Sequence, residues 1–264
     1  MTEEITASET KRCPFCDEEI RFKALVCKHC GQWMPGYTYE SAIRDLIIEK
    51  QVTEVQASTI KEDLETREGQ FELALKWAVG DRSLSLKGFD LAARDLRGID
   101  FSGADLREAN LSESDLSGAK FNEANLTKTN LFRANLKGAK LRKARLKETY
   151  LREANLEQAD LSGSSLLQAD LRGTVMHEAN LYRVDLDSAN LRTADLRQAN
   201  MRDCYLKETN LVATKMEGVQ LNGALLIRAN FTDSDVTEFQ YKRARSIEEI
   251  ITPSGRVYTK VDQA

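Results

Sequence analysis

The sequence predicts a mainly β solenoid that follows a small metal-binding module and a short helical segment. The first observation is an apolar residue at every fifth position from Leu86 to Val236, 31 positions of which 24 are Leu. The second is a small residue, most often Ala, two positions before most of these apolar residues. The third is that all nine glycines of this stretch lie two positions after the apolar residue. Together these three phases predict one repeating unit of five residues.

A period of five fits neither a helix nor a strand. A helix repeats every 3.6 residues and a strand every 2, so neither keeps the apolar positions on one face. The chain must turn a corner after each unit, and four sides close a coil that stacks on the next one through backbone hydrogen bonds. We expect the apolar and small residues to face the lumen, and the glycine phase to need a positive φ. A lumen packed with Leu and Ala leaves no room for a ligand.

The run Gly103-Ala104-Asp105-Leu106, repeated with variations, resembles the pentapeptide-repeat family. The resemblance implies a right-handed quadrilateral β-helix solenoid of pentapeptide repeats over residues 86–241, a rod roughly 37 Å long. Larger side chains take the small inward phase at a few positions, mostly in the end coils: Phe89, Arg94, Ile99, Val184, Val219 and Phe239. We expect Arg94 to reach out of the open end of the rod.

The net charge of the repeat region argues against one role known in this family. One branch of the family protects DNA gyrase with a strongly acidic rod that imitates duplex DNA. Residues 86–245 here carry 25 Lys and Arg against 23 Asp and Glu, so the dense negative field that imitation needs is missing. The same near-neutral balance predicts outer faces of mixed charge.

Two outward features are candidate partner surfaces. The first is a basic cluster, which is either a solvated face or a site for an acidic partner: Lys137, Lys140, Arg142, Lys143, Arg145 and Lys147. The second lies near the C-terminal end, where Tyr205 and Leu225 share an outward column and Ile227 follows. Outward apolar columns indicate contact with something, either the protein's own tail or a second copy.

The two ends of a coiled stack expose unpaired edges, so we expect caps. Residues 37–85 form the predicted helical linker and N-terminal cap, with two or three amphipathic helices broken near Gly69 and ended by Gly80. Residues 242–264 form the predicted C-terminal cap and tail, in which the segment from Ser246 onward has the pattern of a strand, a turn and a strand.

Residues 1–36 contain the metal-binding module. Cys13 and Cys16 form one C-x-x-C pair, and Cys27 and Cys30 form a second. Two such knuckles supply the four thiolates that Zn²⁺ prefers in a closed tetrahedral site. The pattern resembles a short zinc ribbon and predicts one structural zinc ion. Iron on the same thiolates and a redox dithiol are the alternatives.

These features predict a non-enzymatic interaction or scaffold protein, with the ribbon and the rod as separate binding surfaces. The partner is an unidentified protein, and a homodimer through one end of the rod is possible on this pattern. The alternative is a nucleic-acid-associated protein, whose ribbon binds nucleic acid or whose rod acts on a topoisomerase. No run of about 20 apolar residues predicts a membrane span. The acidic N-terminus lacks a secretory pattern, so we expect a cytoplasmic protein.

Overall fold

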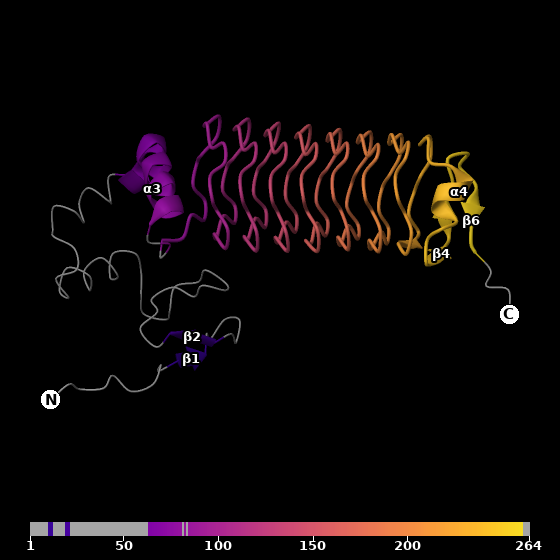
Figure 1. The fold of residues 1–264 in the computed structure, drawn as a ribbon, viewed down its shortest axis with the longest axis horizontal. Coiled ribbons are helices and arrows are strands. Elements are labelled where there is room, and N and C mark those ends of the chain that lie inside the picture. Colours follow the sequence, from indigo (N-terminus) through magenta and orange to yellow (C-terminus); the bar gives the residue numbers. More distant parts are fainter. Residues whose placement is uncertain (1–9, 13–18, 22–62, 81, 83, 261–264) are drawn as a thin grey trace. The chain divides into compact units, whose positions relative to one another are not determined.

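The computed structural model describes residues 10–12, 19–21, 63–80, 82 and 84–260 (Figure 1). The chain divides into two compact units, residues 1–69 and 70–264. In the first unit, strands β1 (Thr10–Arg12) and β2 (Glu19–Arg21) pair antiparallel. The second unit is a rod of stacked coils with a cap at each end (Figure 1). In the part of the chain that is described, no helix has the length and hydropathy to cross a bilayer.

The coils stack with a register of 20 residues. Parallel bridges join each coil to the next, from Asp90 and Asn110 at one end to Asn210 and Asn230 at the other. Around each bridge the backbone hydrogen bonds alternate in direction: Leu106 N–H donates to Asn125 O at 2.8 Å, and Asn125 N–H donates to Ala104 O at 2.8 Å. Each side is too short for a longer strand because the chain turns after five residues. The β structure is therefore a stack of single bridges.

The lumen is filled as the five-residue pattern predicts. Every apolar centre from Leu86 to Val236 is buried. The small phase is buried with it from Ala104 onward, and Val184 and Val219 also fit inside. Phe101 and Phe121 stack with ring centroids 5.7 Å apart. The inward assignment is confirmed.

The corner positions explain the glycine phase. All nine glycines of the array have positive φ, for example Gly118 at 67°. Every other corner from residue 93 to residue 233 also has positive φ and carries a side chain, such as Glu113 at 58° and Arg133 at 54°. L-residues are strained in this conformation. The coil therefore imposes the left-handed corner, and glycine only relieves the strain where it occurs.

Helix α3 (Arg67–Val79) provides the N-terminal cap. Trp77 is buried against Phe101, with ring centroids 6.0 Å apart, and its Nε1–H donates to Leu84 O at 2.8 Å. The helix ends directly before Gly80, as predicted. The helical backbone is interrupted at Thr66, between residues 63–65 and α3, so the break predicted near Gly69 is present three residues earlier, and Gly69 itself lies inside α3. A single glycine costs a helix only about 1 kcal/mol, and the helix passes through it.

Arg94 turns outward to the same helix. Its guanidinium carbon lies 4.8 Å from the centre of the Phe71 ring, which agrees with the expectation that this side chain leaves the core at the open end. Phe89 is buried, whereas Ile99 is half-buried. In the first coil, large side chains can occupy the small inward position because no further coil stacks on that end of the rod.

The C-terminal cap begins earlier than the sequence predicts. Helix α4 (Glu238–Tyr241) replaces the last sides of the array, and Phe239, assigned to the inward phase, is 71% exposed. The reason is a capping box: Gln240 N–H donates to Thr237 Oγ1, and Thr237 N–H donates to Gln240 Oε1. The five-residue coil therefore ends at Val236, and the assignment of residues 237–241 to it is wrong.

Strands β4 (Ser246–Glu248), β5 (Ile250–Ile251) and β6 (Val257–Tyr258) then complete the C-terminal cap. Strand β3 (Leu225–Ile227), in the last coil, pairs parallel with β4. Strands β5 and β6 form an antiparallel hairpin whose turn contains Gly255 at φ 77°. The strand, turn and strand expected after Ser246 are present.

Candidate interaction surfaces

The interior offers no reactive or binding group among the residues described. Cys204, the thiol inside the rod, donates from Sγ to Leu181 O at 2.8 Å. Burial raises the pKa of this thiol to about 12, so it stays protonated and unreactive at neutral pH. A shallow, open pocket of about 490 Å³ is lined by Leu75 of α3 and by Leu96 and Ile99 of the first coil. The side chains available for recognition are therefore those on the outside of the coils.

The Asp and Asn that precede each centre have a structural role. Their Oδ1 atoms accept from the backbone N–H two residues on, as Asn130 does from Phe132 at 3.1 Å. Neighbouring coils join through the same side chains, because Asn130 Nδ2 donates to Asn110 Oδ1 at 3.1 Å. These ladders tighten the corners and hold the coils together. The sequence shows that Asp or Asn recurs before the apolar centres, but only the stacked structure shows that these side chains join neighbouring coils.

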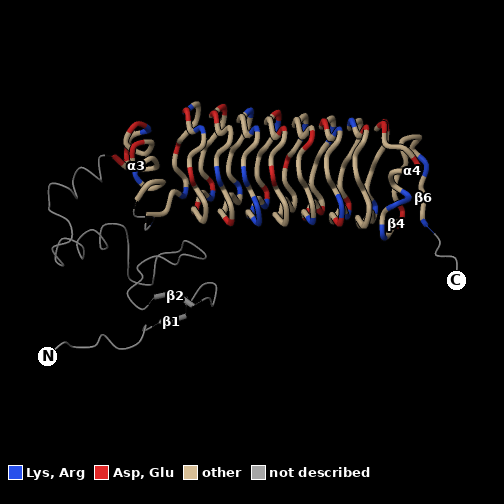
Figure 2. The backbone as a smooth tube through the Cα atoms, in the orientation of Figure 1, with Lys and Arg blue, Asp and Glu red and all other residues tan. Residues whose placement is uncertain are grey.

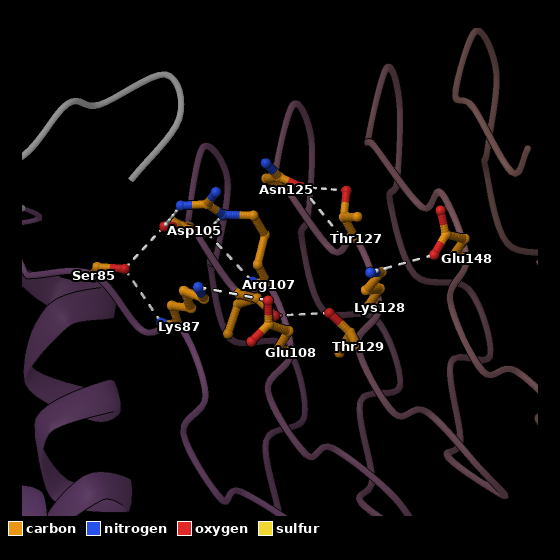
Figure 3. A network of polar contacts seen from close by, with 11 residues as sticks. Ser85, Lys87, Asp105, Arg107, Glu108, Asn125, Thr127, Lys128, Thr129 and Glu148 are labelled. Atoms are coloured by element: carbon orange, nitrogen blue, oxygen red, sulfur yellow. Dashed lines mark hydrogen bonds and ion pairs between the residues drawn. The ribbon is translucent and has the colours of Figure 1, made fainter. Parts of the chain in front are cut away.

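The most enclosed ion pair among the described residues lies in the N-terminal coils (Figure 3). Arg107 Nε donates to Asp105 Oδ1 at 2.8 Å, and both side chains are 16% exposed. Ser85 Oγ donates to Asp105 Oδ2 at 2.9 Å. Burial raises the pKa of the Asp105 carboxyl, but the hydrogen bond and charge of Arg107 outweigh it and hold the pKa below its ordinary value. This group is a structural link between the cap segment and the rod.

The predicted basic cluster is spread over three sides of one coil, and all six of its side chains are exposed. Three members are paired with acids. Lys137 Nζ lies 3.0 Å from Glu157 Oε2, and Arg142 Nε donates to Asp160 Oδ2 at 2.5 Å. Lys147 Nζ lies 3.3 Å from Glu148 Oε1. The cluster is therefore not one uniformly positive face.

The other three cations of the basic cluster do not form ion pairs among the described residues. Within the described residues, Lys140, Lys143 and Arg145 have no acidic oxygen within ion-pair distance. They lie at and beside the corner formed by Lys143, which has a positive φ. Along the rod as a whole, Lys and Arg positions are interspersed with Asp and Glu positions (Figure 2). We call Lys140, Lys143 and Arg145 the corner triad.

The apolar column at the C-terminal end is covered in part. The tail pairs with the edge of Leu225 and Ile227 through β4, and both side chains are half-buried. Tyr205, one coil earlier, remains 49% exposed. The pairing brings the tail to the last coil and leaves Tyr205 on the surface. The structure also exposes apolar side chains that the sequence reasoning did not single out: Tyr150, Val175 and Val257.

The predicted zinc ligands Cys13, Cys16, Cys27 and Cys30 lie outside the described residues. Within the described residues, no three His, Cys, Asp or Glu side chains are grouped to hold a metal. The zinc site therefore stays a prediction.

Stacked five-residue sides, a sealed lumen and left-handed corners define a four-sided solenoid. The family model described as Pentapeptide repeats (8 copies) matches four stretches of the chain, residues 95–131, 129–166, 164–203 and 204–238. These matches span more than half of the chain, and the chain belongs to the pentapeptide repeat family.

Two solved structures are similar to this chain. HetL, a pentapeptide repeat protein involved in heterocyst differentiation regulation in the cyanobacterium Nostoc sp. strain PCC 7120, is 28% identical, with 71% of this chain and 98% of that chain covered and a TM-score of 0.34. QnrB1, a plasmid-mediated fluoroquinolone resistance protein, is 18% identical, with 61% and 76% covered and a TM-score of 0.50. The likeness to QnrB1 shows the fold alone. A search of curated proteins finds no match.

Proposed function

We propose that this protein is a non-enzymatic interaction or scaffold protein, in which the ribbon and the rod are separate binding surfaces. The observation that carries the proposal is the filled lumen: from Leu86 to Val236 it is occupied mostly by Leu and Ala, with Phe, Met, Val, Cys, Ser and Thr at the other inward positions. At interior packing density no substrate fits inside. The outer side chains are mostly engaged in ladders and ion pairs that stiffen the rod, which suits a rigid surface for presenting contacts.

The proposal includes one structural zinc ion in the first unit. The donor set supports it, because two C-x-x-C pairs are a complete tetrahedral set of thiolates. The pairing of β1 with β2 also supports it, since the segment that joins these strands contains Cys13 and Cys16. Bound zinc would supply folding free energy to this small unit and would leave no open position for catalysis.

Nucleic-acid association is the second candidate, and the corner triad is the observation in its favour. Three cations without acidic partners attract phosphate as well as carboxylate. The charge of the rod as a whole gives it less support, because cations and anions nearly balance. Salt-dependent retention on duplex DNA separates the two candidates.

The test of the main proposal captures proteins on the immobilised full chain from its native cytoplasm. Three forms are compared: the wild type, Cys13→Ser with Cys16→Ser, and a variant with all six residues of the basic cluster changed to Gln. We expect each variant to lose a different set of captured proteins while the rod keeps its denaturation midpoint. Variants that both retain every captured protein contradict the proposal. Zinc content, measured by atomic absorption, should fall from one ion per chain to none in the cysteine variant.

A further inference from the structure

The basic cluster belongs to a longer stretch without acids. From residue 124 to residue 147 the sequence has eight Lys or Arg and no Asp or Glu. This stretch makes slightly more than one full coil, so it places cations on all four sides of the rod. Because the charged side chains of this coil are all positive, they repel one another unless acidic side chains on neighbouring coils pair with them. The next coil provides such acids on most sides of the rod.

Three sides follow one rule of pairing, in which the acid lies one coil later. Lys128 Nζ lies 3.5 Å from Glu148, Arg133 Nε lies 2.8 Å from Glu153, and the third pair is that of Lys137 with Glu157. In each pair the two residues are 20 positions apart and stack directly. These three cations are neutralised by the fold itself.

The corner triad breaks this rule. Arg145 bridges to Ser165, and the position stacked on Lys143 is Gly163, so the next coil supplies no charge there. The side chain of Lys143 extends over that glycine, since its Cγ lies 3.7 Å from the point where a Cβ would stand. The absence of a side chain at residue 163 keeps this cation open to solvent.

Lys140 does face an acid, but that acid is occupied. Lys140 bridges to Asp160, whose carboxylate accepts from Arg142 Nε, from Ser162 N–H at 3.1 Å and from Asn180 Nδ2 at 3.0 Å. The side chain of Asp160 is only 9% exposed. With its oxygens engaged, Asp160 leaves Lys140 as a third cation without a partner.

We propose that the corner triad is the docking site for a short acidic segment of a protein partner. The inference rests on the proposed function and names the partner of one of its surfaces. Three exposed cations match a peptide with several carboxylates, and the half-buried Leu167, two positions after the Ser165 that bridges to Arg145, offers an apolar contact one coil later. The triad occupies one coil, and acids lie one or two coils away on the same columns: Glu123, Asp160 and Asp185. A nucleic-acid backbone that followed the rod would meet these acids, whereas a short peptide need not.

The test measures binding of fluorescent probes to the full chain by anisotropy. The probes are a Glu-rich peptide with one central Leu, the same peptide with Gln in place of Glu, and a duplex DNA oligonucleotide. One variant carries Lys140→Gln, Lys143→Gln and Arg145→Gln. The matched control carries Lys128→Gln, Arg133→Gln and Lys137→Gln, which removes the same charge from the same level of the rod.

We expect the Glu peptide to bind the wild type in a salt-dependent way and the triad variant to bind it about ten-fold more weakly or worse. The control should stay within about two-fold of the wild type, because its charges are already neutralised in exposed pairs. Equal weakening in both variants would mean a net-charge effect and overturns the site. Triad-dependent binding of DNA without binding of the Glu peptide also overturns it, in favour of a phosphate partner.

The capture experiment separates this inference from the proposed function. If the six-residue Gln variant loses captured proteins and the Glu peptide does not bind the wild type, only the acidic-segment inference fails. If neither that variant nor the cysteine variant loses any protein, the proposed function fails as well.

Discussion

At its N-terminal end the rod is closed by a helix that contacts the first coils through side chains, whereas at its C-terminal end the chain extends the backbone hydrogen bonding of the coil. Gln70 Oε1 in α3 accepts from Asp90 N–H at 2.6 Å, and Arg82 Nη1 donates to Ser102 O at 3.1 Å. At the other end, Arg228 N–H donates to Glu248 O and Phe231 N–H to Ile251 O, both at 2.8 Å.

The difference teaches how a stacked coil can hide its edges. An open edge exposes rows of unpaired N–H and C=O groups, and either a cover or a further strand satisfies them. A side-chain cover depends on a few residues, chiefly Trp77, so one substitution can loosen it. A backbone ladder depends on no single side chain. Between the ends, every coil has a neighbour on both sides, and we expect the middle to be the most cooperative part.

The largest expected effect lies in the middle of the rod. Leu156→Ala removes a side chain that is fully buried. We expect the free energy of unfolding to fall by about 2–5 kcal/mol, because a cavity remains between coils that cannot collapse. Chemical denaturation measures it. Leu167→Ala, on the outer surface, is the control and should change the midpoint little; equal effects for the two would contradict the inward assignment.

Trp77→Ala should have the next largest effect, and a local one. The change removes the packing on Phe101 and the bond to Leu84 O, so the first coil loses its cover. We expect amide exchange to accelerate at Gly88 and Leu91, with a smaller shift of the global midpoint than Leu156→Ala gives. Exchange at Arg228 and Phe231 should be unchanged. Faster exchange at both ends would show that the two caps are not independent.

Acid should loosen the ion-paired N-terminal coils. The pKa of Asp105 in the folded chain lies below its ordinary value of 3.8. A lowered folded pKa contributes stability that is fully present above the unfolded value and is lost as pH falls below it. We therefore expect Tm to drop below about pH 4. In Asp105→Asn the fall of Tm with pH should be shallower. Identical pH profiles for the wild type and this variant would show that the Asp105 carboxylate does not contribute to the loss of stability in acid.

The smallest effect concerns one corner. A Cβ at residue 118 would meet nothing within 4 Å, so Gly118→Ala adds backbone strain alone at φ 67°. We expect a loss of about 1 kcal/mol in the free energy of unfolding. Glu113→Ala, at φ 58°, keeps the strain that is already present and should be nearly neutral. A neutral Gly118→Ala would mean that the coil tolerates the left-handed corner without cost.

The candidate surfaces were only partly predictable. The sequence located all six cations of the basic cluster, but it did not separate Lys143 from Lys137. That difference depends on Gly163 and Glu157, which stack on them one coil later. The 20-residue stacking, applied to charges, would have found it. The exposure of Phe239 was missed because its spacing fits the array, whereas the capping box of Thr237 and Gln240 ends the coil first.

The amino-acid sequence by itself determined the repeating coil, the residues that fill it and the corners that need a positive φ. It could do so because each five-residue unit solves the same local problem of burial and turning, and the solution repeats until the pattern stops. Only the tertiary structure decided which charges are neutralised, how each end is closed and where the array stops. Those outcomes depend on contacts between residues 20 positions apart, or between a cap and a coil, and such contacts exist only once the chain is stacked.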